Sequence, residues 1–281
     1  MKRELTGILA ALFLLAGCQH GNRYAFVDIA SSEKTLSRLT EGFLSIPDSC
    51  KQDRKSFLLG EGIPVADILL YGDPCQAIPD GYAADTLSTA VFMDHLHVRH
   101  NRLYTDEGSN YRILLLGKDT LSMDELLRLS VLSSEGAFIG GKRPVAVENP
   151  SDSVSFFRTV ERVWMNGNVM SGRTPGSILK AADVLQDMKT RIQGVSYVHR
   201  HLPDAEIYHV CYDGAEPVRA KLKFRVAGRR PTVWNPDTGT ISDVTYKIRR
   251  KKTKVVLDLV PGDDLFVVFC SYADHHRMRY K

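Results

Sequence analysis

Short apolar runs alternate with helix-spaced segments through the first half of the chain. The runs at residues 65–71, 111–117 and 137–140 are largely apolar and end at or near glycine, which is typical of buried strands. Between and after them, apolar residues recur at helical spacing over residues 85–96, 122–133, 153–164 and 177–189. Ser122 and Glu125 have the spacing of a capping box at the start of the second helix. The alternation predicts a mostly parallel sheet with helices on both faces.

The helical period disappears beyond residue 193. Seven short strand-like segments follow, separated by turns rich in Gly, Pro and Asp: residues 196–200, 206–212, 218–226, 232–234, 244–249, 254–259 and 265–270. Between Val218 and Val226, every second residue is apolar and those between are Lys or Arg, which indicates one buried and one solvated sheet face. These segments predict an antiparallel β-sandwich.

Together the two patterns predict a fold of the α/β plus all-β class. An open, mostly parallel α/β domain, flavodoxin-like or glutamine-amidotransferase-like, is expected at residues 56–192, and the β-sandwich at residues 193–272. Residues 18–55 are polar and irregular, and they predict a linker with one short helix around residues 32–44. Residues 273–281 are expected to form a tail.

The first residues have the three parts of a secretory signal. Lys2 and Arg3 give a positive start, residues 5–15 are mostly apolar, and Ala16 and Gly17 lead into Cys18. The apolar run is shorter than the roughly 20 residues of a membrane-spanning helix. We therefore expect residues 1–17 to be a lipoprotein signal peptide and the Cys18 thiol to carry the lipid. This predicts a protein of the cell envelope, held outside the cytoplasm at the periplasmic face of a membrane or at the cell surface.

The composition and net charge of the chain indicate which kinds of partner it could bind. Hydrophobic residues make up 43% of the chain and charged residues 25%, which suits an ordinary globular protein. The formal net charge is +4, and the densest basic run, residues 249–252, lies between two strand-like segments as a hairpin tip would. Nucleic acid is therefore not expected as a partner.

Four cysteines remain besides Cys18. Export permits disulfides, and Cys50, Cys75, Cys211 and Cys270 allow three pairings, which the sequence leaves open. Cys211 and Cys270 lie in apolar strand-like runs, where a free buried cysteine is the more common arrangement.

The sequence lacks the common motifs of nucleotide binding and of nucleophilic catalysis. No GxGxxG follows the first strand, and neither a GxxxxGK[ST] loop nor a Gly-x-Ser-x-Gly elbow occurs. The histidine pairs His95/His97 and His199/His201 could share a strand face, but no third metal ligand has a clear spacing relative to either pair. The sequence therefore predicts no metal, no cofactor and no self-evident catalytic residues.

Several stretches resemble the bacterial α-L-rhamnosidases of glycoside hydrolase family 106. Residues 56–72 (SFLLGEGIPVADILLYG) are similar to the passage from the catalytic barrel of that family into the following α/β domain. Residues 110–116 (NYRILLL) resemble the next buried strand, and residues 197–200 (YVHR) with 204–208 (DAEIY) resemble the entry to the C-terminal sandwich. Residues 228–231 (GRRP) through 234–239 (WNPDTG) match a hairpin that other sugar-hydrolase sandwiches share.

A further match lies earlier in the chain. Residues 39–49 (LTEGFLSIPDS) resemble the segment just before the family's barrel, with Ile46 where a second proline is usual. The resemblance implies that this chain joins the flanking and C-terminal domains, with the barrel missing between about Lys51 and Lys55. The family's catalytic glutamates and metal ligands belong to that barrel, so the resemblance assigns no catalytic residue here.

Three functions follow as hypotheses. The first is a non-catalytic accessory or remnant lipoprotein of rhamnose-containing glycan degradation. The second is a carbohydrate-binding surface lipoprotein, with Trp234, Tyr208, His199 and Arg200 as candidate glycan-binding residues. The third is an active hydrolase that uses Asp67, Asp85 or Glu107 with a histidine. The expected partners are a membrane through the lipid, a glycan, and a protein at the surface that would face a barrel.

Overall fold

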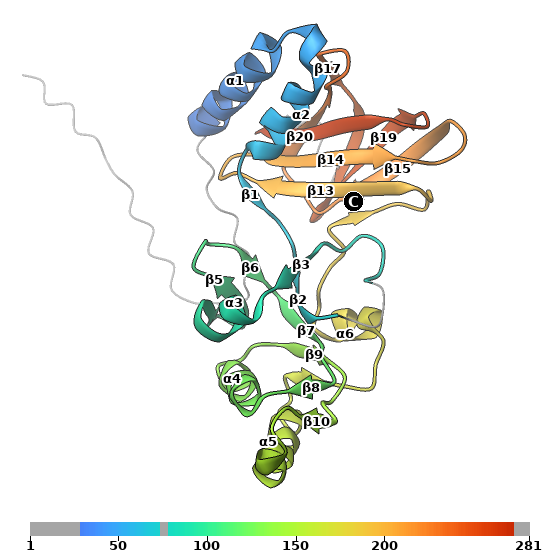
Figure 1. Cartoon of the computed structure of the whole chain (residues 1–281). Helices are drawn as coiled ribbons and strands as arrows, with labels where there is room; N and C mark the ends of the chain where they lie inside the picture. Colours follow the sequence, from blue (N-terminus) through green and yellow to red (C-terminus); the bar gives the residue numbers. More distant parts are fainter. Residues whose placement is uncertain (1–28, 74–77, 273–281) are drawn as a thin grey trace, which may run out of the picture.

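The computed structural model describes residues 29–73 and 78–272. It is a mixed α/β structure with several parallel and antiparallel sheets, and Figure 1 shows these gathered into two lobes. The predicted signal peptide, Cys18, Cys75 and the predicted tail at residues 273–281 lie outside the described residues. No described helix is both long enough and apolar enough to cross a membrane.

A parallel sheet forms the centre of one lobe. Its five strands are β2 (Ile68–Gly72), β3 (Ala84–Leu87), β7 (Ile113–Gly117), β9 (Ile139–Gly141) and β11 (Val169–Met170). Their order across the sheet is β11-β9-β7-β2-β3, and every neighbouring pair is parallel. The apolar runs predicted as buried strands form β2, β7 and β9.

Helices cover both faces of this sheet. Helices α3 (Thr89–Asp94), α4 (Met123–Ser134) and α5 (Ser153–Trp164) pack into one core cluster, and α6 (Pro175–Ala181) contributes to another on the opposite face. The predicted capping box is confirmed, because the Ser122 side chain accepts a hydrogen bond from the backbone N–H of Glu125 and the Glu125 carboxylate accepts one from that of Ser122. Two small sheets, β4 (Leu96–Arg99) with β5 (Arg102–Thr105) and β6 (Asn110–Tyr111), and β8 (Thr120–Leu121) with β10 (Ala146–Val147), complete the lobe.

Two of the helices predicted from the sequence are wrong in extent. The segment at residues 85–96 is divided into β3, the short helix α3 and the first residue of β4, because residues 84–87 pair with β2 and Ser88 caps α3. The segment at residues 177–189 is helical only as far as Ala181. Beyond it, β12 (Met188–Lys189) pairs with a strand of the other lobe.

The second lobe contains two antiparallel sheets with a shared core. The six-stranded sheet has the order β1 (Ile63–Pro64), β13 (Val195–His201), β14 (Glu206–Tyr212), β20 (Asp264–Tyr272), β16 (Arg229–Asn235), β17 (Thr240–Asp243). The four-stranded sheet has the order β12, β15 (Val218–Phe224), β19 (Lys252–Leu259), β18 (Thr245–Arg249). Apolar side chains of both sheets form one cluster, and the Tyr208 ring contacts Phe224 and Phe269 edge-on. The alternation in residues 218–224 is confirmed, with the Lys and Arg positions exposed.

The two N-terminal helices pack on the outer face of the six-stranded sheet (Figure 1). Helix α1 (Ile29–Ser45) contributes Leu39 and Phe43, and α2 (Lys51–Gly60) contributes Leu58. These side chains pack against Trp234 and Phe266 of the sheet. Residues 51–55, where the resemblance places the missing barrel, lie within the continuous helix α2.

Candidate functional site

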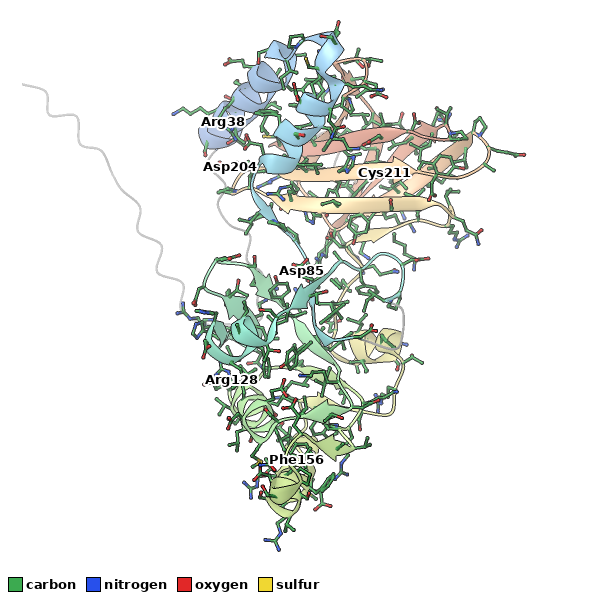
Figure 2. The ribbon with its side chains drawn as sticks, in the orientation of Figure 1. Arg38, Asp85, Arg128, Phe156, Asp204 and Cys211 are labelled. Atoms are coloured by element: carbon green, nitrogen blue, oxygen red, sulfur yellow. The ribbon has the colours of Figure 1, made fainter. Side chains whose placement is uncertain are left out.

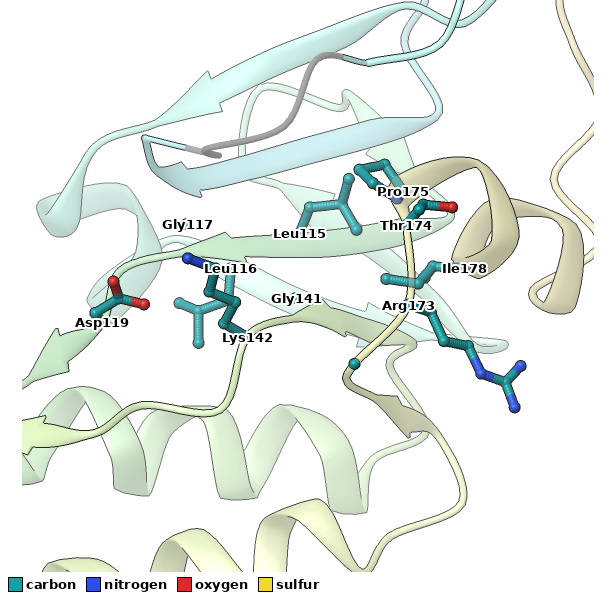
Figure 3. A pocket seen from close by; sticks show the side chains of 11 residues that line it. Leu115, Leu116, Gly117, Asp119, Gly141, Lys142, Arg173, Thr174, Pro175 and Ile178 are labelled. Atoms are coloured by element: carbon teal, nitrogen blue, oxygen red, sulfur yellow. The ribbon is translucent and has the colours of Figure 1, made fainter.

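A cavity of about 350 Å³ lies at the carboxyl ends of β7 and β9, the edge of a parallel sheet where ligands commonly bind. Its apolar walls include Leu115, Leu116 and Ile178, and its charged side chains are Asp119, Lys142 and Arg173. Figure 3 shows Asp119 and Lys142 at one end of the cavity and Arg173 at the other, directed away from both. Asp119 is the single carboxylate among the lining residues, so the cavity lacks the carboxylate pair that glycoside hydrolysis uses.

Gly141 fixes the close approach of β9 and β7 at this cavity. Its φ is +128°, a conformation that residues with a side chain rarely adopt. A Cβ at this position would also lie 2.3 Å from the Leu116 carbonyl oxygen. A larger residue here would therefore distort the cavity wall.

A second cavity, of about 520 Å³, lies where the two lobes meet at the amino ends of β2 and β7. Arg225 binds a carboxylate of each lobe, with its guanidinium 2.6 Å from Asp67 and 3.1 Å from Asp187. His199 lies between Asp187, at 2.8 Å from Nδ1, and Glu206, at 2.9 Å from Nε2. These five residues, which we call the junction network, connect the segment before β2 to β13, β14 and the loop after α6.

Burial and charge act in opposite directions in the junction network. Burial disfavours the imidazolium of His199, but hydrogen bonds to Asp187 and Glu206, and their charges, outweigh it and raise the pKa of His199 to about 9. Burial likewise opposes ionisation of Asp187 and Glu206, yet hydrogen bonds from His199 and its charge hold both carboxyl pKa values below the usual range. At neutral pH, Asp187 and Glu206 are therefore both ionised, and each is paired with the imidazolium of His199.

A third cluster lies on the outer face of the six-stranded sheet, beside α2. His209 and Cys211 are two residues apart on β14, and Asp264 lies opposite Cys211 at the start of β20. The ligand-type atoms of these three side chains all lie within 4.8 Å of one another. Asp264 also accepts a hydrogen bond from Lys55 of α2. Among the cysteines that the structure describes, Cys50, Cys211 and Cys270 are free thiols.

The candidate glycan-binding residues are not arranged as a sugar-stacking platform. Trp234 and Tyr208 are 0% exposed, since Trp234 packs under α1 and Tyr208 lies between the two antiparallel sheets. His199 belongs to the junction network. Arg200 donates hydrogen bonds to the carbonyl oxygens of Glu61 and Gly62, which hold it to the turn before β1. Trp234 and Tyr208 are therefore core residues.

The carboxylates considered for hydrolysis are dispersed. Asp67 is buried and paired with Arg225 and Arg112, Asp85 accepts a hydrogen bond from the Tyr111 hydroxyl at 2.9 Å, and Glu107 is an exposed turn residue. His95 follows the end of α3 and only His97 lies in β4, so they do not share a strand face, but both rings contact Asp106 at the surface, at 2.7 and 2.8 Å.

The residues of the junction network lie in separate segments of the sequence, and no local pattern connects them. The sequence pattern predicts a helix at Asp187 and a solvated strand position at Arg225, so it connects neither residue with His199. One local signal for the third cluster is present in the sequence, since His209 and Cys211 alternate with apolar residues on a strand. Its third member, Asp264, comes from a strand whose pairing the sequence does not specify.

The antiparallel lobe and the parallel-sheet lobe place the protein in the mixed α/β fold class. Comparison with known proteins identifies its family. The family model of alpha-L-rhamnosidase, glycoside hydrolase family 106, matches residues 52–248. The chain belongs to this family, which confirms the resemblance predicted from the sequence. Residues 39–49 precede the matched range, so their likeness to a pre-barrel segment stays a prediction.

Two relatives show how much of a larger protein the chain represents. A putative beta-glucuronidase of Formosa agariphila is 27% identical over 239 residues, which cover 77% of this chain and 20% of that protein. The structure of a rhamnosidase from Novosphingobium sp. PP1Y superposes with a TM-score of 0.74 at 26% identity, and covers 81% of this chain and 24% of that one. The chain therefore spans a quarter or less of the length of these relatives.

Proposed function

We propose that this protein is a lipid-anchored, non-catalytic accessory or remnant component of rhamnose-containing glycan degradation. The observation that carries the proposal is the junction network, in which Asp67, Asp187 and Glu206 are each paired with arginine or histidine. A glycosidase needs one carboxylic acid that retains a proton and a second carboxylate nearby. The lowered pKa values of Asp187 and Glu206 leave neither suited to donate a proton at neutral pH. Membership of the family supports the class of glycan.

The test is an activity assay of the full chain with an aryl α-L-rhamnoside, beside an active α-L-rhamnosidase as positive control. We expect no turnover above the rate of the buffer. Hydrolysis that co-purifies with the protein and is abolished by Glu206→Gln or Asp67→Asn would contradict the proposal and favour an active hydrolase.

The lipid anchor is a separate part of the proposal and rests on the Lys2-Arg3 start, the apolar run and the Ala-Gly-Cys18 sequence. It would place the protein in the cell envelope. Labelling of producing cells with a radioactive fatty acid should mark the wild-type chain and the Cys50→Ser control. The Cys18→Ser variant should carry no label, and equal labelling of all three chains would argue against this anchor.

We also infer a flavodoxin-like arrangement for the parallel-sheet lobe. Numbered along the chain, its strands have the spatial order 2-1-3-4-5, which is the order of flavodoxin-like sheets. The antiparallel lobe is correspondingly interpreted as a β-sandwich, with its core between the two sheets.

A protein partner is proposed for the lobe of parallel strands. Val154 of α5 is 69% exposed and Phe157 41% exposed, which supports a contact surface on this helix. Size-exclusion chromatography of the full chain with cell extract should shift the protein to a larger species. The variant Val154→Ser/Phe157→Ser should stay at the monomer position, and a wild-type monomer under all conditions would count against the partner.

A further inference from the structure

His209, Cys211 and Asp264 converge on one point of the outer sheet face (Figure 2 labels Cys211 on this sheet). Successive side chains of β14 alternate between its two faces, so Ile207, His209 and Cys211 share the outer face while Tyr208 and Val210 enter the core between the sheets. Asp264 is the register partner of Cys211 on β20. The backbone therefore sets all three side chains beside one another without requiring a flexible loop.

The two distances from the Cys211 sulfur are close to those between ligands of one ion. Two ligands bound tetrahedrally to zinc, a sulfur at about 2.3 Å and a nitrogen at about 2.05 Å, lie about 3.6 Å apart. Cys211 Sγ lies 3.6 Å from His209 Nε2 and 4.0 Å from Asp264 Oδ1. His209 and Asp264 are in direct hydrogen-bond contact, so an ion entering between them would replace this contact with two coordination bonds.

The charges around the cluster also suit a divalent cation. A neutral imidazole, a thiolate and a carboxylate would together neutralise a charge of +2. Lys55 binds Asp264 through Oδ2, whereas Oδ1 faces His209 and Cys211, so the lysine can orient the carboxylate while Oδ1 remains available as a ligand. His209 is held in place by stacking on Phe266, with ring centroids 4.6 Å apart. Cys211 and Asp264 are partly exposed, which leaves a path for the ion and a fourth position for water.

We propose that His209, Cys211 and Asp264 form a binding site for a first-row divalent metal ion of the zinc type. Mixed sulfur, nitrogen and carboxylate ligands in a tetrahedral arrangement favour zinc over calcium or magnesium, which prefer oxygen ligands alone. The ion joins the end of β14 to the start of β20 beside α2. The site is independent of the glycan-related function proposed above, because it lies on the opposite side of β14 from the core and apart from the junction network.

The test uses the full, reduced and metal-free chain with Co²⁺ as a visible substitute for Zn²⁺. Wild-type protein should take up one equivalent and show the near-ultraviolet absorption of a thiolate–cobalt bond, and one equivalent of Zn²⁺ should remove this absorption. Absence of thiolate–cobalt absorption from the wild-type chain would overturn the proposal without any variant.

Three variants locate the ion. Cys211→Ser should lose the thiolate–cobalt absorption, and Asp264→Asn should weaken Co²⁺ binding at least tenfold. Cys50→Ser, which removes another partly exposed thiol, should bind as the wild type does. Thermal unfolding with and without Zn²⁺ gives a second readout, because Zn²⁺ should raise the Tm of the wild type and of Cys50→Ser but not that of Cys211→Ser. Full absorption in Cys211→Ser, or its loss in Cys50→Ser, would place the ion elsewhere and overturn the assignment.

Discussion

His199 is a buried imidazole that the fold keeps protonated. It is 6% exposed, and the groups that face it are Asp187, Glu206, Tyr208 and, through Asp187, Arg225. Because its folded pKa of about 9 lies above the ordinary value of 6.5, protonation stabilises the folded state. This contribution is fully present below pH 6.5 and is lost as pH rises through about 9. We expect a loss of roughly 3 kcal/mol in the free energy of unfolding across that interval.

Urea unfolding at a series of pH values measures this loss. The variant His199→Gln should be less stable than the wild type at pH 6.5, and its stability should lack the decline between pH 6.5 and 9. His97→Gln is the matched control, since His97 is half-exposed and pairs with an exposed aspartate. A decline of equal size in His199→Gln and the wild type would show that another group is responsible.

At the scale of single residues, the sequence predicts chemistry only where the partners are local. Ser122 and Glu125 are three residues apart, and their capping box could be predicted because one helical turn brings them together. His199 and Asp187 are twelve residues apart, and their contact depends on the end of α6 and on the pairing of β12 with β15. The burial of Trp234 likewise depends on α1, almost two hundred residues earlier in the chain.

Docking of α1 on the six-stranded sheet depends on Phe43. Its side chain is fully buried, its ring centroid lies 5.1 Å from that of Trp234, and the Arg54 guanidinium lies over its ring at 5.6 Å from the centroid. Phe43→Ala should lower the free energy of unfolding by about 3–5 kcal/mol, because it leaves a cavity between helix and sheet. Leu44→Ala, at a position 54% exposed, should change it by less than about 0.5 kcal/mol. Denaturant titration of both variants gives the comparison, and equal effects would refute the docking role of Phe43.

The sequence predicts the elements that have a strong hydrophobic pattern. It does not predict those that form through pairing with a strand elsewhere in the chain. The runs that form β2, β7 and β9 are apolar on both sides because helices cover both faces of the parallel sheet. Residues 85–96 have helical spacing, but the open edge of β2 supplies backbone partners to residues 84–87, and sheet pairing outweighs the helical preference there. The sequence predicts a helix at residues 32–44, and α1 extends over Ile29–Ser45, but its own sequence does not specify where it packs on the sheet.

The two lobes of the molecule are joined by short strands that pass from one lobe into a sheet of the other, and by buried ion pairs. Strand β1, just before the parallel sheet, pairs with β13 of the antiparallel lobe, and β12 follows α6 into the four-stranded sheet. Within this frame Arg225 reaches from the end of β15 to Asp67 at the start of the parallel lobe. Removing one member of a buried ion pair leaves the other charge without compensation, which is far more costly than losing an exposed pair.

Arg225→Gln should therefore uncouple the lobes. We expect it to lower the free energy of unfolding by about 3 kcal/mol, since both carboxylates stay buried while Asp67 keeps only Arg112, at 3.3 Å, and Asp187 only His199 as a charged partner. Differential scanning calorimetry should show one transition for the wild type and two for the variant, because each lobe has its own apolar core. Arg219→Gln removes a nearby arginine, in β15, whose partner Asp258 is exposed, and it should leave the single transition within the error of measurement. A single, equally shifted transition in both variants would mean that apolar contacts and the strand pairing of β1 and β12 couple the lobes without Arg225.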